Sequence, residues 1–172
     1  MRHLLKRISI LFAMAGAVIL VGWNVDAEPN RTTLPELAGL VHYTTVRRGN
    51  VTEHIMTTNE AIQAVKNGQP VPAGTHFVLV DYRDGEIYRT FVMEKGSGWG
   101  GDYDEDRRTG DWQFQWFKPD GSVNMAENTA RCQSCHSSRA DEDFLYTSML
   151  SRNLTEPSLT RPDKIPGEGV AS

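Results

Sequence analysis

The feature that most constrains this chain of 172 residues is a pair of cysteines three positions apart, followed at once by a histidine. Cys132, Cys135 and His136 form the pattern C-x-x-C-H, and the chain has no other cysteine. Two thiols at this spacing can reach the two vinyl groups of one haem, and the imidazole of the next residue then lies under the iron. The motif therefore predicts one covalent haem c, attached through Cys132 and Cys135, with His136 as the iron ligand.

Three other interpretations of the motif are open but less favoured. A thioredoxin-like redox disulfide normally follows a strand near the start of a βαβ unit, and no parallel β pattern follows this motif. A structural zinc site usually needs four ligands, whereas Cys132, Cys135 and His136 supply at most three. The third is that the pattern occurs by chance.

The first 27 residues have the features of a secretion signal. Three basic residues occur within the first seven positions, residues 8–21 form a nearly unbroken apolar run, and small residues precede Glu28 at the spacing that a signal peptidase needs. An uncleaved membrane anchor is the alternative, although the apolar run is shorter than the ~20 residues that span a bilayer. Because covalent haem attachment takes place outside the cytoplasm, the signal agrees with the motif and predicts a periplasmic protein.

The charge of the chain limits its partners. The whole chain has a formal net charge of −4 at pH 7, and the mature chain is more acidic because the signal carries three basic residues and one acidic residue. Acidic proteins are poor partners for nucleic acid and anionic lipid. We therefore expect no nucleic acid binding and no membrane contact beyond the signal segment.

The middle of the chain is rich in β-branched and aromatic residues between turn signals, which is typical of an antiparallel sheet. The predicted strands are residues 41–47, 51–56, 75–82, 86–94 and 111–118. Asp84-Gly85 joins two of them as a hairpin turn. In the last strand, three aromatic residues alternate with Gln113 and Gln115, which predicts a half-buried strand.

Two helices complete the predicted fold. Thr57 to Glu60 has capping-box spacing, with Thr57 as the N-cap of a short helix that ends at Gly68. The second helix lies within residues 125–140 and holds the cysteine motif. The expected fold class is α+β, with an antiparallel sheet packed with helices and a haem motif near the C-terminus. We divide the chain into a signal (1–27), a haem domain (28–154) and a flexible tail (155–172) that is rich in Pro, Gly and Ser.

Several pieces of the chain together resemble the cytochrome P-460 and cytochrome c′-beta family. The resemblance covers about His42 to Tyr146 and rests on TNEAIQAVKNGQPVPAGT (58–75), FVMEKGSGW (91–99), GDWQFQWF (110–117) and CQSCH (132–136) followed by FLY (144–146). It implies an antiparallel sheet packed with helices, a haem held against the sheet, a periplasmic location and often a homodimer. Four-helix cytochromes c′ also carry the motif near the C-terminus, but this chain has strands where they have helices.

One departure from that family bears on activity. Its catalytic members cross-link a strand lysine to the haem and oxidise hydroxylamine, and that lysine aligns near Leu79 in a strand without lysine. The sequence therefore resembles the branch without the cross-link, which binds small gases such as nitric oxide. Phe77 and Leu79 share one face of their strand, opposite His76, Val78 and Val80. Either face could cap the haem; we take Phe77 and Leu79 as the cofactor-binding candidates, with ordinary sheet core as the alternative. Arg131 is a candidate partner for a haem propionate, and Lys95 is a candidate for the same role or for a displaced cross-link.

The sixth iron position separates the possible functions. A strong sixth ligand favours electron transfer, whereas an open position favours gas binding or peroxide chemistry. The candidate ligands in the mature chain are His42, His54, His76, Met56, Met93, Met125 and Met149. We expect these histidines to be ordinary strand residues and these methionines to fill the core.

The favoured function is a haem protein with five-coordinate iron that binds a small diatomic ligand such as nitric oxide. The second hypothesis is an electron-transfer cytochrome with a redox partner protein. The third is an enzyme that oxidises hydroxylamine or uses peroxide.

Overall fold

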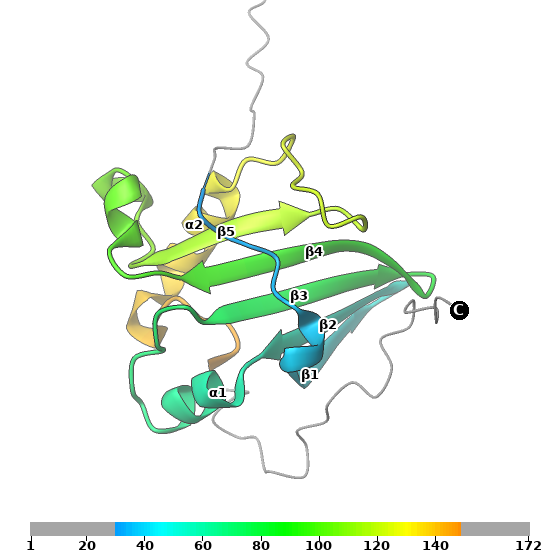
Figure 1. Cartoon of the computed structure of the whole chain (residues 1–172), viewed down its shortest axis with the longest axis horizontal. Coiled ribbons are helices and arrows are strands. Elements are labelled where there is room, and N and C mark those ends of the chain that lie inside the picture. Colours follow the sequence, from blue (N-terminus) through cyan, green and yellow to red (C-terminus); the bar gives the residue numbers. More distant parts are fainter. Residues whose placement is uncertain (1–29, 149–172) are drawn as a thin grey trace, which may run out of the picture.

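The computed structural model describes residues 30–148, which fold into one antiparallel sheet with helices packed against it (Figure 1). The strands are β1 (Val41–Arg48), β2 (Val51–Thr57), β3 (His76–Arg83), β4 (Glu86–Lys95) and β5 (Trp112–Phe117). The α-helices are α1 (Asn59–Lys66) and α2 (Ala130–His136), and the 3-10 helices are η1 (Leu37–Gly39), η2 (Trp99–Asp102), η3 (Glu105–Arg107) and η4 (Ser137–Glu142).

The five strands are hydrogen-bonded in their chain order, β1 to β5, so the sheet is a simple meander. Each predicted strand is present within two residues of its expected bounds. Asp84 and Gly85 form the turn between β3 and β4, with φ of 52° and 86°, as their tolerance of positive φ predicts. The α+β class with an antiparallel sheet is therefore confirmed.

Each face of the sheet has its own buried core, because successive side chains of a strand point to opposite sides. The face that carries α2, called the α2 face below, buries Phe77 and Met93 together with Ile62 of α1. The opposite face buries a second cluster that includes Val78 and Val92.

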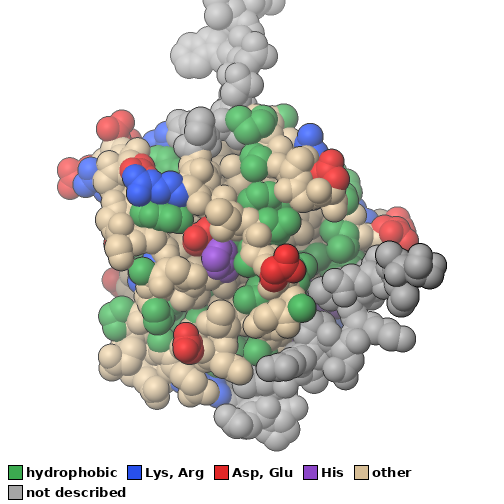
Figure 2. Space-filling view, viewed as in Figure 1, with side chains coloured by type: hydrophobic (Ala, Val, Ile, Leu, Met, Phe, Trp, Pro, Cys, Tyr) green, Lys and Arg blue, Asp and Glu red, His purple; other side chains and the backbone are tan. Residues whose placement is uncertain are grey.

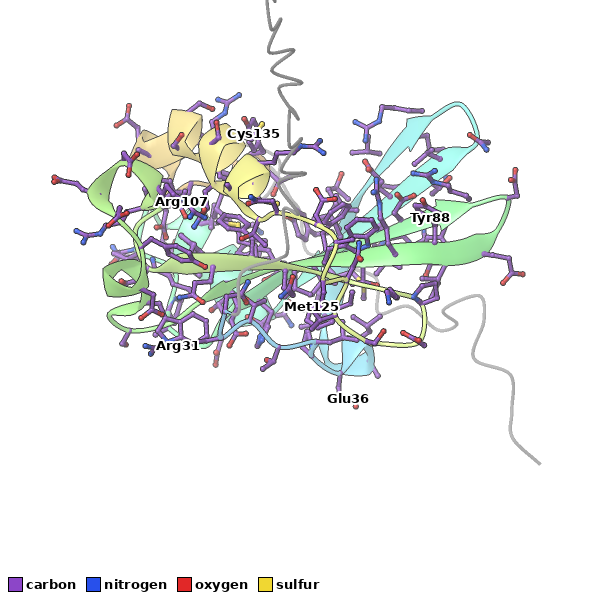
Figure 3. All side chains as sticks on the ribbon, turned by 90° about the horizontal axis from the view of Figure 1, so that it is seen from above. Arg31, Glu36, Tyr88, Arg107, Met125 and Cys135 are labelled. Carbon is purple, nitrogen blue, oxygen red and sulfur yellow. The ribbon has the colours of Figure 1, made fainter. Side chains whose placement is uncertain are left out.

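Residues 30–40 pass over the opposite face and change the environment of β5. Figure 3 shows α2 on one side of the sheet and the segment that contains Glu36 on the other. The side chain of Asn30 donates a hydrogen bond to the carbonyl of Phe114 (2.7 Å), and the N–H of Arg31 donates one to Oε1 of Gln113 (2.8 Å). Gln113 is fully buried as a result. The prediction that β5 is half-buried is therefore wrong, although its aromatic and amide side chains alternate as predicted.

Helix α1 begins one residue later than the capping-box spacing predicts. Thr58 is its N-cap, and its hydroxyl accepts a hydrogen bond from the N–H of Ala61 (3.2 Å). Thr57, the predicted cap, instead ends β2 and donates its hydroxyl to the carbonyl of His76 (2.7 Å). Because Thr57 bonds to the neighbouring strand, the next residue becomes the N-cap. At the other end of the helix, Gly68 has a φ of 64°.

The predicted signal (1–27) and tail (155–172) lie outside the described residues. Among residues 30–148, no helix is long and apolar enough to cross a membrane. Figure 2 views the face opposite to α2, where uncharged and apolar atoms make up most of the surface and one histidine is visible near the centre.

Candidate functional site

The cysteine motif lies on α2, which is anchored through Gln133, the first of the two residues between the cysteines. The side chain of Asn128 accepts a hydrogen bond from the N–H of Ala130 (2.7 Å) at the start of the helix. Gln133 is 2% exposed, and its side-chain oxygen accepts a hydrogen bond from Arg107 (2.8 Å). Because Gln133 takes the buried position, Cys135 remains exposed and Cys132 is only partly buried, and both are free thiols.

A cavity of about 840 Å³ lies between α2 and the sheet, within the usual size range of a cofactor pocket. All six site residues predicted from the sequence line it: Phe77, Leu79, Arg131, Cys132, Cys135 and His136. Its wall on the sheet is mostly apolar, with Ile55, Phe91, Met93 and Phe114 beside the predicted pair. Strand register thus brings Phe77 and Leu79 to the motif, which follows them more than fifty residues later in the sequence.

His136 is held in the orientation that a metal-binding imidazole requires. Its Nδ1 lies 2.7 Å from the carbonyl oxygen of Phe144, so Nδ1 carries the proton and Nε2 keeps a free lone pair. The ring packs between Phe114 and Tyr146, at centroid distances of 4.8 and 5.1 Å. Burial lowers the pKa of His136 below its ordinary value, and the hydrogen bond to Phe144 only partly opposes this effect. The imidazole is therefore neutral at pH 7 and able to bind iron.

The carbonyl of Phe144 reaches His136 because the chain turns sharply after η4. Asp143 and Phe144 both have positive φ, 51° and 63°, which is costly for residues other than glycine. The carboxylate of Asp143 accepts hydrogen bonds from Nζ of Lys95 (2.7 Å) and Nε1 of Trp112 (3.2 Å). These contacts hold the strained turn in place.

Sequence reasoning did not identify Asp143, because neither periodicity nor motif spacing distinguishes it. Lys95, proposed as a propionate partner or a displaced cross-link, does not line the cavity and forms an ion pair with Asp143. Arg131 lies at the cavity with 86% of its side chain exposed, and it pairs with Glu127 at 3.5 Å.

The three histidines that are candidates for the sixth iron position have partners outside the cavity. The rings of His42 and His54 lie 4.7 Å apart beside Tyr82 of the opposite face, and His76 pairs with Glu94 at 3.1 Å. None of these three histidines lines the cavity.

The methionines divide into three groups. Met56 lies in the core of the opposite face and Met93 in the core of the α2 face, as expected for core-filling methionines. Met125 is 50% exposed, so the expectation that it fills the core is wrong. Met149 lies outside the described residues. Met93 is thus the one described methionine that lines the cavity.

The cavity has a charged end that sequence reasoning also missed. Arg48 and Glu53 line it and pair at 2.6 Å, and Arg89 lines it and donates from Nε to the carboxylate of Asp81 at 2.8 Å. Asp81 is fully buried and also lies 3.5 Å from Arg83. These residues come together only through the register of β2, β3 and β4, which pairs Glu53 with Asp81 and Asp81 with Arg89.

The arrangement fits a haem. One wall supplies two thiols and a neutral imidazole with a free Nε2, the facing wall is apolar, and the cavity between them has the required size. Within residues 30–148, no three His, Cys, Asp or Glu side chains gather as a group that could hold a metal ion, so the structure adds no zinc ligands to the motif.

Comparison with known proteins supports the same assignment. Residues 38–147 match the Cytochrome P460 family, which covers more than half of the chain and the whole of the cavity and motif. Among curated proteins, no significant relative was found. The chain belongs to the cytochrome P460 family, whose members are c-type haem proteins.

Proposed function

We propose that this is a periplasmic protein with one haem c, covalently attached through Cys132 and Cys135, whose iron binds His136 and leaves its other axial position open to nitric oxide or similar ligands. The observation that carries this proposal is the fixed imidazole of His136 facing a cavity with apolar walls. The signal pattern in residues 1–27 supports export.

The proximal side is prepared by the residues around His136. The carbonyl of Phe144 holds Nδ1–H and leaves Nε2 for the iron, while Phe114 and Tyr146 restrict rotation of the ring. A hydrogen bond of this kind raises the basicity of the imidazole and strengthens its bond to a metal. The ligand therefore needs little reorganisation when haem binds.

The distal side lacks an evident strong ligand among the described residues. The other three described histidines lie away from the cavity, and Met93 is the cross-strand neighbour of Phe114, whose ring contacts His136. Met93 lines the cavity from the sheet wall, so it is the described residue to test first if the iron proves six-coordinate. Apolar neighbours such as Leu79 and Phe91 favour neutral diatomic ligands over water or anions.

Oxidation of hydroxylamine through a lysine cross-link has less support. Leu79, at the aligned position, lines the cavity as an aliphatic side chain. The lysines of the described chain are Lys66, Lys95 and Lys118. None of them lines the cavity.

The proposal is tested by the absorption spectrum of the exported full chain, produced together with haem-attachment machinery. Spectra are recorded oxidised and reduced, before and after nitric oxide. We expect a broad five-coordinate ferrous spectrum that shifts at once when the gas is added. The matched variant Leu79→Lys, which brings an amine into the cavity, should give sharper six-coordinate bands and slower nitric oxide binding.

Sharp, split six-coordinate bands in the unsubstituted protein, indifferent to nitric oxide, would contradict the proposal. They would favour an electron-transfer cytochrome, with Met93 and Met149 as the first ligands to test. A red-shifted band from a modified haem would instead favour the enzyme.

A further inference from the structure

The chemistry of a haem fixes which of its edges faces α2, given the proposed attachment on which this inference rests. The two vinyl groups of haem are on one edge of the ring, and the two propionates are on the opposite edge. Cys132 and Cys135 bind the vinyl edge at α2. The propionates must therefore point away from α2, toward the far end of the cavity or its mouth.

Arg89 lies at that far end. It precedes Met93 by four residues on β4, and Met93 pairs with Phe114, which contacts His136. At ~3.3 Å per strand residue, Arg89 is roughly 13 Å along the strand from this contact. Both His136 and Arg89 line the same cavity. In Figure 3, Cys135 lies over one end of the sheet, and Tyr88, the neighbour of Arg89, lies toward the other end.

The guanidinium of Arg89 is held in place but keeps free donors. Its Nε donates to Asp81 at 2.8 Å, and its central carbon lies 4.6 Å from the ring centre of Phe91 and 5.1 Å from that of Trp116. Its side chain is only 25% exposed. Among residues 30–148, the two terminal nitrogens have no hydrogen-bond partner, and they form the fork that binds a carboxylate in bidentate geometry.

The charges around Arg89 also favour an anion. Asp81 is fully buried between two arginines, Arg83 and Arg89, and its Oδ1 accepts no hydrogen bond from the described residues. Arg48 and Glu53 neutralise each other beside them. Three arginines face two carboxylates, which leaves one positive charge at this end of the cavity for an anionic group to balance.

We propose that Arg89 binds a haem propionate through its terminal guanidinium nitrogens. Arg131 is the propionate partner that its position beside Cys132 suggests. It lies at the vinyl edge, however, and pairs with Glu127. Arg89 is thus a binding residue for the cofactor, held ready by Asp81 and two aromatic rings.

The test compares Arg89→Gln with two matched controls in the exported, haem-loaded protein at one pH. Arg83→Gln removes a positive charge beside the same carboxylate of Asp81, and Arg83 does not line the cavity. Arg131→Gln removes the alternative partner. The readouts are the propionate-bending band in resonance Raman spectra and the midpoint potential of the iron. Covalent haem content is measured first in every variant.

We expect Arg89→Gln to shift the propionate band and to lower the midpoint potential, because an uncompensated propionate charge stabilises ferric iron. Both controls should keep the band and change the potential less. Arg89→Lys keeps the charge beside Asp81, so it should fold, hold a potential close to that of the unsubstituted protein and still shift the band.

Haem-loaded Arg89→Gln and Arg89→Lys proteins with an unchanged band would overturn the proposal, as would a band that moves only in Arg131→Gln. These outcomes leave the haem site itself intact. An unsubstituted protein without haem would overturn the proposed function and this inference together.

Discussion

Cys132 and Cys135 differ in environment although they are only three residues apart. Cys135 is exposed, whereas Cys132 packs against the core of the α2 face. Burial raises the pKa of the Cys132 thiol to about 11, and the carboxylate of Glu127 adds to the effect. At neutral pH Cys132 is therefore a protonated thiol, unlike the reactive thiolate of a redox-active disulfide. This favours the haem interpretation of the motif over the thioredoxin-like one.

The difference predicts the order in which the thiols react in the apoprotein. Iodoacetamide should modify Cys135 first at pH 7 to 8, because thiolate rather than thiol is the nucleophile. Modification of Cys132 should accelerate as the pH rises toward about 11, where its raised pKa lies. Peptide mapping by mass spectrometry checks both rates, with urea-unfolded protein as the control in which the two rates converge. Equal rates in the folded protein at pH 7 would contradict the environment assigned to Cys132.

At the scale of elements, the turn after η4 (Ser137–Glu142) orients the imidazole of His136. Asp143 connects β4 and β5 to this turn through Lys95 and Trp112, and the next residue presents its carbonyl to His136. The sheet thus holds His136, the proposed iron ligand, in orientation without a direct bond to its Nδ1.

Substitution of Asp143 should therefore change the iron as well as the stability. Asparagine tolerates positive φ, so Asp143→Asn keeps the turn but loses the ion pair with Lys95, which should lower the free energy of unfolding by roughly 1–3 kcal/mol. When the Phe144 carbonyl is held less firmly, its hydrogen bond to Nδ1 of His136 weakens. The imidazole then becomes less basic and donates less electron density to the iron. We expect a lower iron–histidine stretching frequency and a higher midpoint potential.

Glu142→Gln is the matched control for this variant. Glu142 is adjacent in sequence but pairs with Arg139 rather than with the sheet. It should leave the iron–histidine frequency unchanged. A frequency that stays constant in Asp143→Asn as well would show that the turn does not position His136.

At the scale of the whole molecule, the features that the sequence predicts are those that depend on interactions between residues close together in the chain. The meander joins neighbouring strands, so periodicity and turn signals predict every strand. The motif singles out Cys132, Cys135 and His136, which line the cavity. The charged end could not be found this way, because Glu53, Asp81 and Arg89 meet only through the register of three strands.

Two further features depended on contacts between distant segments. The buried Gln113 of β5 accepts a hydrogen bond from Arg31, and Asn30 bonds to the neighbouring Phe114, both from more than eighty positions away. The role of Asp143 depends on donors from β4 and β5 and on positive φ at a residue other than glycine. Neither leaves a pattern in the local sequence.

A cavity of this size also predicts that the fold depends on its cofactor. A Cys132→Ala/Cys135→Ala double variant, which cannot attach haem, leaves apolar walls such as Phe77 and Leu79 without a partner. If filling the cavity contributes about 2–3 kcal/mol, the thermal midpoint of the variant should fall by roughly 10 °C. Calorimetry of the variant and the holoprotein checks this, with the unsubstituted apoprotein as the control that keeps both thiols. Equal midpoints would contradict a cavity that haem fills.

The central claim is that Cys132 and Cys135 carry one haem, and the mass of the exported protein under denaturing conditions tests it most directly. The account predicts the mass of the mature chain plus one haem, retained after denaturation and lost in the Cys132→Ala/Cys135→Ala variant. A polypeptide mass without haem, from cells that attach haem to another c-type cytochrome, would contradict it.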